Sequence, residues 1–464
     1  VPRNAEQVRA RVRELKALGC DGIKFFGMDR DLFAAFADEA HKQGLRIAHH
    51  AGVEETNAWD DIKFGTTSIE HWYGIPDAAI ESGRQNFPAS YNYNNEVDRF
   101  RYAGHLWREA NWERLLKVLD GMVAANVYNR MIMPTSFGNP EAEYWRLING
   151  VSQWDVGVER QVQIKGPDAG KLAQILSPRD LSTCKVGQGK YVPLCNHRGT
   201  VINDPILLKL ADDLYWLSIA DSDIWFWASA IAAERGLNVE ISEPDVSPMA
   251  LQGPKAEDVV AHVLGDWVRS LKYFWFRETE IEGIPIAVQR SGWSKQGGFE
   301  IYLKDGRKGT RLWNTFKEAG KPWDIGPGAP ATPERVESGL VSVGGDTDDD
   351  TNPFEVRLGK YVDLDVADDV VGIQALRQIK AEGIKRHQLG LVLEGDKPAP
   401  LGFRLEDISF NGSPVGKMTN CVWSPRMKAN IGYALISSSV RACETVTINR
   451  ASGPARAKLV ELPF

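Results

Sequence analysis

Residues 186–210 read VGQGKYVPLCNHRGTVINDPILLKL, and this stretch decides the fold class of the larger part of the chain. Its apolar runs are short, polar turns separate them, and it leads into hairpin-like strands that extend to Ile219. A similar pair of strands is predicted at residues 284–288 and 299–303. Helices such as residues 255–264 come between these strands. Hairpins with interspersed helices predict an α+β fold from Val127 onward.

The sequence before this region has a different pattern, in which helices and short apolar strands alternate. Apolar residues recur at three- and four-residue steps in residues 7–18, and the strand GIKFFG follows at 22–27. A second helix then leads into LRIAHH at 45–50. This order predicts a parallel α/β unit.

A β-rich stretch begins near Lys385 and continues to the C-terminus. The two changes of pattern divide the 464 residues into three expected domains, at residues 1–125, 127–380 and 381–464.

Composition excludes several functional classes. The net charge is −7, with 55 basic against 62 acidic residues, so we expect no nucleic-acid partner. No apolar run approaches the ~18 residues of a membrane span, so we expect no membrane partner. The five cysteines are scattered, which fits reduced thiols in the cytoplasm better than a disulfide framework.

In the N-terminal unit, Lys24, His49 and His71 each end a predicted strand. Such residues converge at one rim of a parallel barrel, and imidazoles there suit Zn²⁺. A carbamylated lysine in that ring is an anionic bridging ligand between two metals. If the strand is shifted by one residue, His50 replaces His49.

The segments GCDGIKFFG, RIAHHAG and GTTSIEH resemble the middle strands of the amidohydrolase superfamily. This resemblance covers residues 1–125 and implies three of the eight strands of a TIM barrel. It also implies that Lys24, His49 and His71 are metal ligands. The other ligands of that superfamily are missing, so we expect an incomplete fragment that binds zinc only if it is functional.

From residue 127 the chain carries linked motifs in order: residues 128–169 including WDVGVERQVQIKGPDA, then DVSPMALQGPKA, IPIAVQRSGWSKQGGFEIYL and TNCVWSPRMKANIGYALI. Together they resemble the glycine-cleavage T-protein (aminomethyltransferase) family. The phrases LSIADSDI, EPDVSP and TNPFE are similar to its dimethylsulfoniopropionate demethylase branch. The resemblance implies a folate-binding domain, a C-terminal β-barrel domain and tetrahydrofolate as cofactor.

Glu300 is the first candidate for folate binding. A buried carboxylate that accepts hydrogen bonds from the pterin edge is an economical recognition element. Glu300 lies on a predicted strand beside Gly297 and Gly298, which allow close approach. It also matches the pterin-binding glutamate of the family. Tyr191 and Ser222 are further candidates for contact with folate.

Asn203 and Asp204 follow a predicted strand where T-proteins hold two acids. The resemblance implies that the aspartate polarises the folate nitrogen during aminomethyl transfer, and Asp204 is the only acid left here. The sequence departs from the T-protein pattern a second time at Ala331 and Thr332, where the family has Arg and Asp. We expect Arg335 and Glu337, shortly after them, to form a structural ion pair. These losses favour transfer of a methyl group.

The region is also rich in aromatic residues, and a sulfonium donor would need them. Such a cation has no proton to donate, so ring faces must recognise it. Six candidates accompany the folate motifs: Trp216, Trp225, Trp227, Tyr273, Trp275 and Trp293. We expect two-thirds of them in the core and Trp293 in the substrate cavity.

The sequence therefore predicts a tetrahydrofolate-dependent methyltransferase that takes a methyl group from a small sulfonium donor, with Asp204 and Trp293 at the reaction site. Three alternatives stay open: an aminomethyltransferase of the glycine-cleavage type, a metal-dependent amidohydrolase, and a folate-binding module without catalysis. The oligomeric state is left open.

Overall fold

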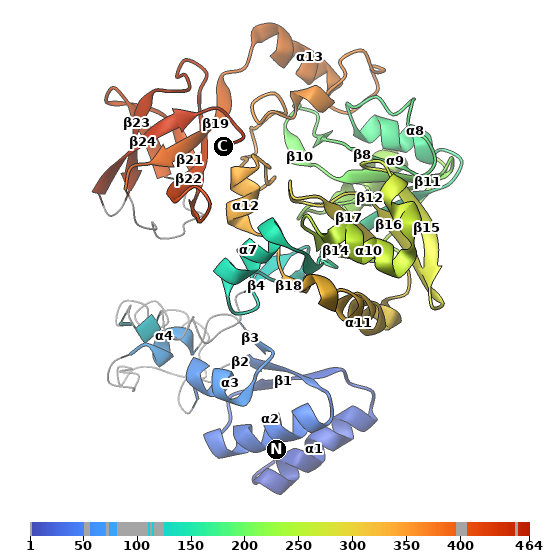
Figure 1. Ribbon diagram of the computed structural model, residues 1–464, viewed down its shortest axis with the longest axis vertical. Helices are drawn as coiled ribbons and strands as arrows, with labels where there is room; N and C mark the ends of the chain where they lie inside the picture. Colours follow the sequence, from blue (N-terminus) through green and yellow to red (C-terminus); the bar gives the residue numbers. More distant parts are fainter. Residues whose placement is uncertain are drawn as a thin grey trace. The chain divides into compact units, whose positions relative to one another are not determined.

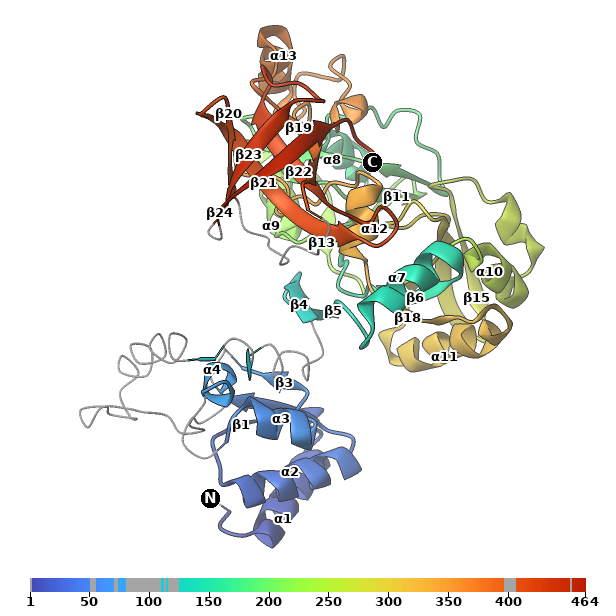
Figure 2. The ribbon, with the colours of Figure 1, turned by 60° about the vertical axis from the view of Figure 1, so that its left-hand side comes forward.

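The computed structural model describes residues 2–50, 56–70, 74–80, 110–111, 114–115, 125–395, 406–450 and 453–464. The chain divides into two compact units, Val1–Ala124 and Ala125–Phe464 (Figures 1 and 2). No helix among these described residues has both the length and the apolar character needed to cross a membrane.

The first unit contains a three-stranded parallel sheet in the order β1-β2-β3. Its elements are α1 (Ala5–Ala17), β1 (Gly22–Phe26), α2 (Arg30–Lys42), β2 (Arg46–His50), α3 (Ala58–Phe64), β3 (Ser68–Ile69) and α4 (Ile75–Ala78). Its core joins Val8 and Val12 of α1, Phe33 of α2, and Phe25 and Ile47 of the sheet. The alternation of helices and parallel strands agrees with the sequence pattern, whereas the assignment of this unit to a fragment of a TIM barrel stays a prediction.

The second unit is built on two sheets. One has five antiparallel strands in the order β13-β7-β12-β11-β8. Their bounds are β7 (Gln161–Lys165), β8 (Gln188–Tyr191), β11 (Ile206–Ala211), β12 (Leu214–Ser218) and β13 (Glu240–Ser242).

The other sheet has six strands in the order β15-β16-β17-β14-β6-β18, antiparallel except for the parallel pair β18 and β6. Their bounds are β6 (Ser152–Asp155), β14 (Ser247–Gln252), β15 (Phe276–Ile281), β16 (Ile284–Gln289), β17 (Gly298–Leu303) and β18 (Gly326–Gly328). Two two-stranded sheets add β4 (Ala125–Tyr128), β5 (Met131–Pro134), β9 (Leu194–Cys195) and β10 (Val201–Asn203).

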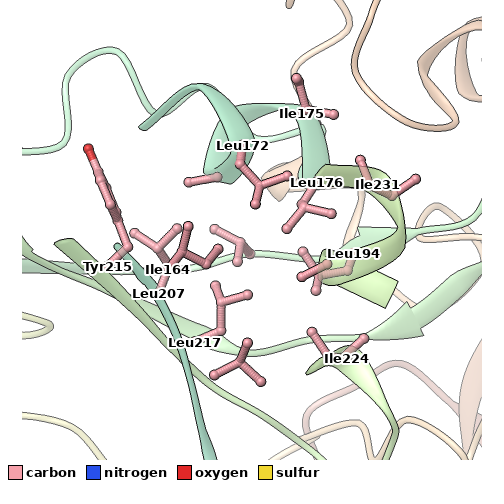
Figure 3. Close-up of a cluster of buried hydrophobic side chains, with 14 of the residues drawn as sticks. Ile164, Leu172, Ile175, Leu176, Leu194, Leu207, Tyr215, Leu217, Ile224 and Ile231 are labelled. Carbon is pink, nitrogen blue, oxygen red and sulfur yellow. The ribbon is translucent and has the colours of Figure 1, made fainter. Parts of the chain in front are cut away.

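Helices cover one face of each main sheet. Leu172 and Leu176 of α8 (Ala169–Leu176) and Ile231 of α9 (Ile224–Glu234) pack on Leu207 and Leu217 of the five-stranded sheet (Figure 3). The six-stranded sheet packs in the same way against α10 (Ala256–Leu264) and α11 (Gly309–Ala319). The helices that remain are α7 (Pro140–Asn149), α12 (Thr332–Glu337) and α13 (Ile373–Glu382), with 3₁₀ turns at Asp266–Ser270, Gly306–Lys308, Lys321–Trp323 and Gly359–Tyr361.

The faces that carry no helices meet each other. Leu208 and Trp216 of the five-stranded sheet form one buried cluster with Phe276, Ala287 and Tyr302 of the six-stranded sheet. A β-bridge between Gln188 and Trp275 joins the sheets at one side. The candidate site lies where the two sheets meet.

The C-terminal part is a closed barrel in the order β19-β22-β21-β20-β23-β24. Its strands are β19 (Arg386–Leu393), β20 (Glu406–Phe410), β21 (Ser413–Ser424), β22 (Ala429–Ser437), β23 (Thr445–Arg450) and β24 (Gly453–Val460). Closure removes the exposed strand edges that an open sheet would present. The predicted C-terminal β-barrel domain is confirmed.

Candidate active site

Three buried or half-buried carboxyl groups from separate segments form the centre of the candidate site. Glu159 lies between β6 and β7, Asp204 follows β10, and Glu300 is on β17. Burial raises the pKa of Glu159 well above its usual range, and the charges of Glu300 and Asp204 raise it further. The Glu159 carboxylate therefore lies within electrostatic range of the other two. We call Glu159, Asp204 and Glu300 the site carboxylates.

Glu300 is held by donors on one of its two oxygens. Its Oε2 accepts a hydrogen bond from the Ser291 hydroxyl at 2.5 Å and lies 3.2 Å from the Tyr302 hydroxyl. Burial raises the pKa of Glu300, and these two hydrogen bonds oppose the rise. Among the residues that the structure describes, Oε1 has no hydrogen-bond partner, so it can accept one from a ligand.

Asp204 is hydrogen-bonded to Tyr191, the last residue of β8. The Tyr191 hydroxyl donates to Asp204 Oδ2 at 2.5 Å. Burial raises the pKa of Asp204 to about 7, although the Tyr191 hydrogen bond lowers it. The carboxyl group therefore changes its charge near neutral pH.

Asn203 has a structural role, because it fixes the loop after β12. Its Nδ2 donates to the Ala220 carbonyl at 2.9 Å and to Ser222 Oγ at 2.7 Å. Its Oδ1 accepts from the main-chain N–H groups of Ala220 and Asp204. Both donors and both acceptor positions of the amide are used within the protein.

The turn between β4 and β5 is hydrogen-bonded to the loop after β12. Asn129 and Arg130 both have positive φ, 48° and 65°, as a two-residue hairpin turn of the primed type requires. Asn129 donates its main-chain N–H to Asp221 Oδ1, and its side chain bonds to the Val158 carbonyl and the Ser222 N–H. The predicted folate residue Ser222 is thus tied to two neighbouring segments, and its contact with folate stays a prediction.

Tyrosines surround the site carboxylates. Burial and nearby carboxylate charge raise the pKa of Tyr128, Tyr191 and Tyr302 above the usual tyrosine range. Tyr361 packs on Tyr191 with ring centroids 4.9 Å apart. The hydroxyls of Tyr128, Tyr191 and Tyr302 are therefore neutral at physiological pH.

The sequence reasoning missed Glu159, Tyr128 and Tyr361. Glu159 lies in the motif DVGVER, and a charged residue between two apolar strands was the available signal. Tyr128 and Tyr361 reach the site through long-range packing and have no comparable local signal.

The site carboxylates have no cationic side chain as a partner. None of the three forms a salt bridge within the described part of the chain. No lysine or arginine is among the causes that shift their pKa values. The site is therefore negatively charged when deprotonated, and an entering cation would be stabilised there.

The acidic residues around α12 differ from the site carboxylates, because each of them has a cation or hydrogen-bond donors as partners. Arg335 forms a buried ion pair with Asp346, and Glu337 binds Arg426 at 2.7 Å. Glu334 accepts from the Lys295 N–H at 2.9 Å. We call Glu334, Arg335, Glu337 and Asp346 the α12 network. The expected pair of Arg335 with Glu337 is wrong: both residues make ion pairs, but with other partners.

Trp293 lies beside this network. The Arg335 guanidinium carbon is 5.5 Å from the centre of a Trp293 ring, so an internal cation already occupies one face. Contact of the other face with substrate stays a prediction. Of the six aromatics, Trp216 is buried, whereas Tyr273 is 61% exposed.

In the N-terminal unit His49 and Lys24 lie on opposite faces of the sheet, and their role as metal ligands stays a prediction. Side chains alternate along a strand, and His49 stacks on Phe25 at 4.2 Å and bonds to Asp61 at 2.8 Å on the helix-covered face. Lys24 points to the opposite face, where Glu70 is 3.3 Å away. His50 is one residue on from His49 and therefore shares the Lys24 face.

His71 lies outside the described residues. Within the described ranges, no group of three or more His, Cys, Asp or Glu residues is arranged to hold a metal ion.

Comparison with known proteins identifies the family. Residues 113–366 match the model of the GCVT N-terminal domain, and residues 386–464 match the glycine cleavage T-protein C-terminal barrel domain. The chain belongs to the glycine cleavage T-protein family. This confirms the prediction for the region from residue 127, whereas the likeness of residues 1–125 to amidohydrolases stays a prediction.

Two curated relatives of this T-protein family member have different activities. A dimethylsulfoniopropionate demethylase of Ruegeria pomeroyi is 40% identical over 322 residues, which cover 69% of this chain and 86% of the relative. An aminomethyltransferase of Caldanaerobacter subterraneus is 30% identical over 312 residues, which cover 66% of this chain and 82% of the relative.

The fold is also that of a solved T-protein. The glycine cleavage system aminomethyltransferase T of Bartonella henselae matches with a TM-score of 0.64 and 21% identity, over 74% of this chain and 94% of that one. The predicted T-protein fold is confirmed.

Proposed function

We propose that this chain is a tetrahydrofolate-dependent methyltransferase that demethylates a small sulfonium compound of the dimethylsulfoniopropionate type. The relative from Ruegeria pomeroyi, 40% identical over 86% of its length, supports this donor class. The structural observation that carries the proposal is the cluster of site carboxylates without a cationic partner.

The charge of the site suits a sulfonium donor. A sulfonium ion is positively charged and carries no N–H or O–H, so it cannot be recognised through donated hydrogen bonds. Carboxylates attract it by charge, and aromatic ring faces add about 0.5–2 kcal/mol each by cation–π attraction. Tyr128 and Tyr191 lie within the influence of Asp204 and can supply such faces.

The residues present also fit a reduced folate. The free Oε1 of buried Glu300 can accept the donors of the pterin edge, while Ser291 and Tyr302 keep the carboxylate in place through Oε2. When bound, tetrahydrofolate supplies the nitrogen nucleophile that takes the methyl group. Glu300 would orient it, and proximity with exclusion of water would do most of the catalytic work.

Asp204 is available to hold a proton. When a methyl group moves from sulfur to an N–H nitrogen, the C–S electron pair stays on the sulfur and the nitrogen loses its proton. Asp204, with a pKa of about 7, can take up that proton at neutral pH. Tyr191 fixes the carboxylate by donating to its Oδ2.

Aminomethyl transfer is the second candidate, because Asp204 is kept and aminomethyltransferases are among the relatives. Asn203 argues against it. Its amide is fully used within the protein and cannot act as a base. A metal-dependent hydrolase is not proposed, because no group of three or more His, Cys, Asp or Glu residues in the described ranges is arranged to hold a metal ion.

One assay separates the two candidates. The purified chain is incubated with tetrahydrofolate and dimethylsulfoniopropionate, and the folate product is identified by mass spectrometry. We expect a methylated folate and the demethylated sulfide. Production of methylene-tetrahydrofolate from an aminomethylated carrier, with no reaction on the sulfonium, would establish aminomethyl transfer instead.

A further inference from the structure

Two cationic side chains flank the tyrosine next to the candidate site. The Arg179 guanidinium carbon is 5.1 Å and the Lys360 Nζ 4.9 Å from the ring centre of Tyr361. Tyr361 packs on Tyr191, and the Tyr191 hydroxyl donates to Asp204. A continuous line of contacts therefore links these cations to the negatively charged centre.

Neither cation has a carboxylate partner among the described residues. Arg179 is half-buried, and its Nη1 donates to the main-chain carbonyl of Tyr191 at 2.6 Å. Burial lowers the pKa of Arg179. The adjacent carboxylate of Asp180 instead accepts from the Ser182 N–H at 2.8 Å and from its hydroxyl at 2.9 Å. A half-buried guanidinium without an anion is costly, and a ligand carboxylate would relieve that cost.

We propose that Arg179 and Lys360 bind the carboxylates of the glutamyl tail of the folate, an inference that rests on the proposed function. The length of Tyr191 favours the glutamyl tail of the folate over the carboxylate of the methyl donor as the group that these cations bind. Arg179 meets the main-chain end of Tyr191, whereas Asp204 meets its hydroxyl end. The three-carbon chain of a small sulfonium acid is shorter than a tyrosine side chain, but the aryl spacer of a folate separates pterin from glutamate widely enough.

The side chains along this line of contacts become exposed to solvent at Lys360. Asp204, Tyr191 and Arg179 are half-buried, and Lys360 is exposed. A tail that passes Arg179 would therefore reach Lys360 and then solvent. Additional γ-linked glutamates would meet Lys360, so a polyglutamyl folate should bind more tightly than the monoglutamate.

The experiment measures folate binding without a methyl donor. Tetrahydrofolate with one and with three glutamates is titrated into the wild-type chain, Arg179→Gln and Lys360→Gln. Glutamine at 179 removes the charge and keeps a polar side chain at this position. Lys317→Gln is the matched control, because Lys317 is an exposed lysine of α11 without an ion pair in the described chain.

We expect Arg179→Gln to weaken both folates about tenfold, as for the loss of a charge-assisted hydrogen bond. Lys360→Gln should weaken the triglutamate about two- to threefold, in keeping with an exposed ion pair, and added salt should have the same effect. The control should bind like the wild type, and thermal unfolding should confirm that all variants fold.

Two results would overturn the proposal. If both variants bind the two folates like the wild type, the cations do not contact the tail; a raised KM for dimethylsulfoniopropionate alongside this result would assign them to the donor. If the wild-type chain binds no tetrahydrofolate at all, the proposed function fails and this subsite fails with it.

Discussion

The second unit contains two groups of buried acidic residues, and they differ in their partners. In the α12 network each carboxylate has a cation or several donors, as in the pair of Arg335 with Asp346. The site carboxylates have no cation among the described residues, and their pKa values are raised. A buried carboxylate without a partner is unfavourable. The first group is therefore explained by the stability of the fold, and the second needs a ligand to explain it.

The largest expected effect tests the structural role of the α12 network. Arg335→Met removes the partner of Asp346, which is 1% exposed, and should lower the free energy of unfolding by about 3–5 kcal/mol. Urea denaturation measures this. Arg307→Met is the control, because the pair of Arg307 with Asp305 is on the surface and is worth about 0–1 kcal/mol. Equal losses in both variants would mean that the network has no special structural role.

A smaller effect is expected for folate affinity at Glu300. Glu300→Gln should weaken tetrahydrofolate binding by about 1.5–3 kcal/mol, the scale of a hydrogen bond to a charged group. The free energy of unfolding should not fall, because glutamine keeps the shape and removes an unpaired buried charge. Titration calorimetry and urea denaturation give the two quantities. Glu280→Gln on β15 of the same sheet is the control, and an unchanged affinity at position 300 would remove Glu300 from the site.

Trp293 lies beside the α12 network and is also a candidate for the substrate cavity. Trp293→Leu keeps apolar bulk but removes the ring face, and the absence of one cation–π interaction should cost about 0.5–2 kcal/mol. If a methylated cation uses the free face, the KM of the donor rises while folate affinity stays nearly constant. A fall in unfolding free energy with an unchanged KM would place Trp293 in the α12 network alone.

The smallest effect on turnover is expected at Asp204. Direct methyl displacement needs no strong base, so Asp204→Asn should lower kcat less than tenfold, whereas general-base catalysis would contribute about 10²–10⁴-fold. Steady-state rates with one methyl donor measure the difference. A collapse of activity in Asp204→Asn would show that proton removal by Asp204 limits the methyl transfer.

The pH dependence of Asp204 adds a test of stability. The folded chain holds this proton up to about pH 7, whereas the ordinary value is 3.8. Since the folded state binds more protons between these values, the free energy of unfolding should fall as pH rises through this window. Urea denaturation at pH 5 and pH 8 should show a smaller fall in Asp204→Asn. The KM of a cationic donor should decrease as pH passes 7, because the carboxylate forms there.

The sequence was informative where local pattern and family motif coincide. Glu300 follows two glycines on an apolar strand, and it lies buried on β17 as expected. The same reasoning could not find Glu159, because its role depends on how a loop approaches two segments that are distant in sequence. It also could not decide which face of the sheet His49 takes, because a register difference of one residue decides the face of a strand. Periodicity predicts a strand but does not fix which of two adjacent histidines points to which side.

The hydrogen bonds of Asn203 bear on how this branch of the family could change. A return to the two-acid pattern requires Asn203→Asp, which would remove both donors, leave the Ala220 carbonyl facing a carboxylate oxygen and require the Ser222 hydroxyl to turn and donate. It would also add a fourth negative charge beside Asp204. The reversal would be tolerated only after the loop at residues 220–222 had changed first. Asn203 therefore couples this position to the loop at residues 220–222, so that a change at one requires a change at the other.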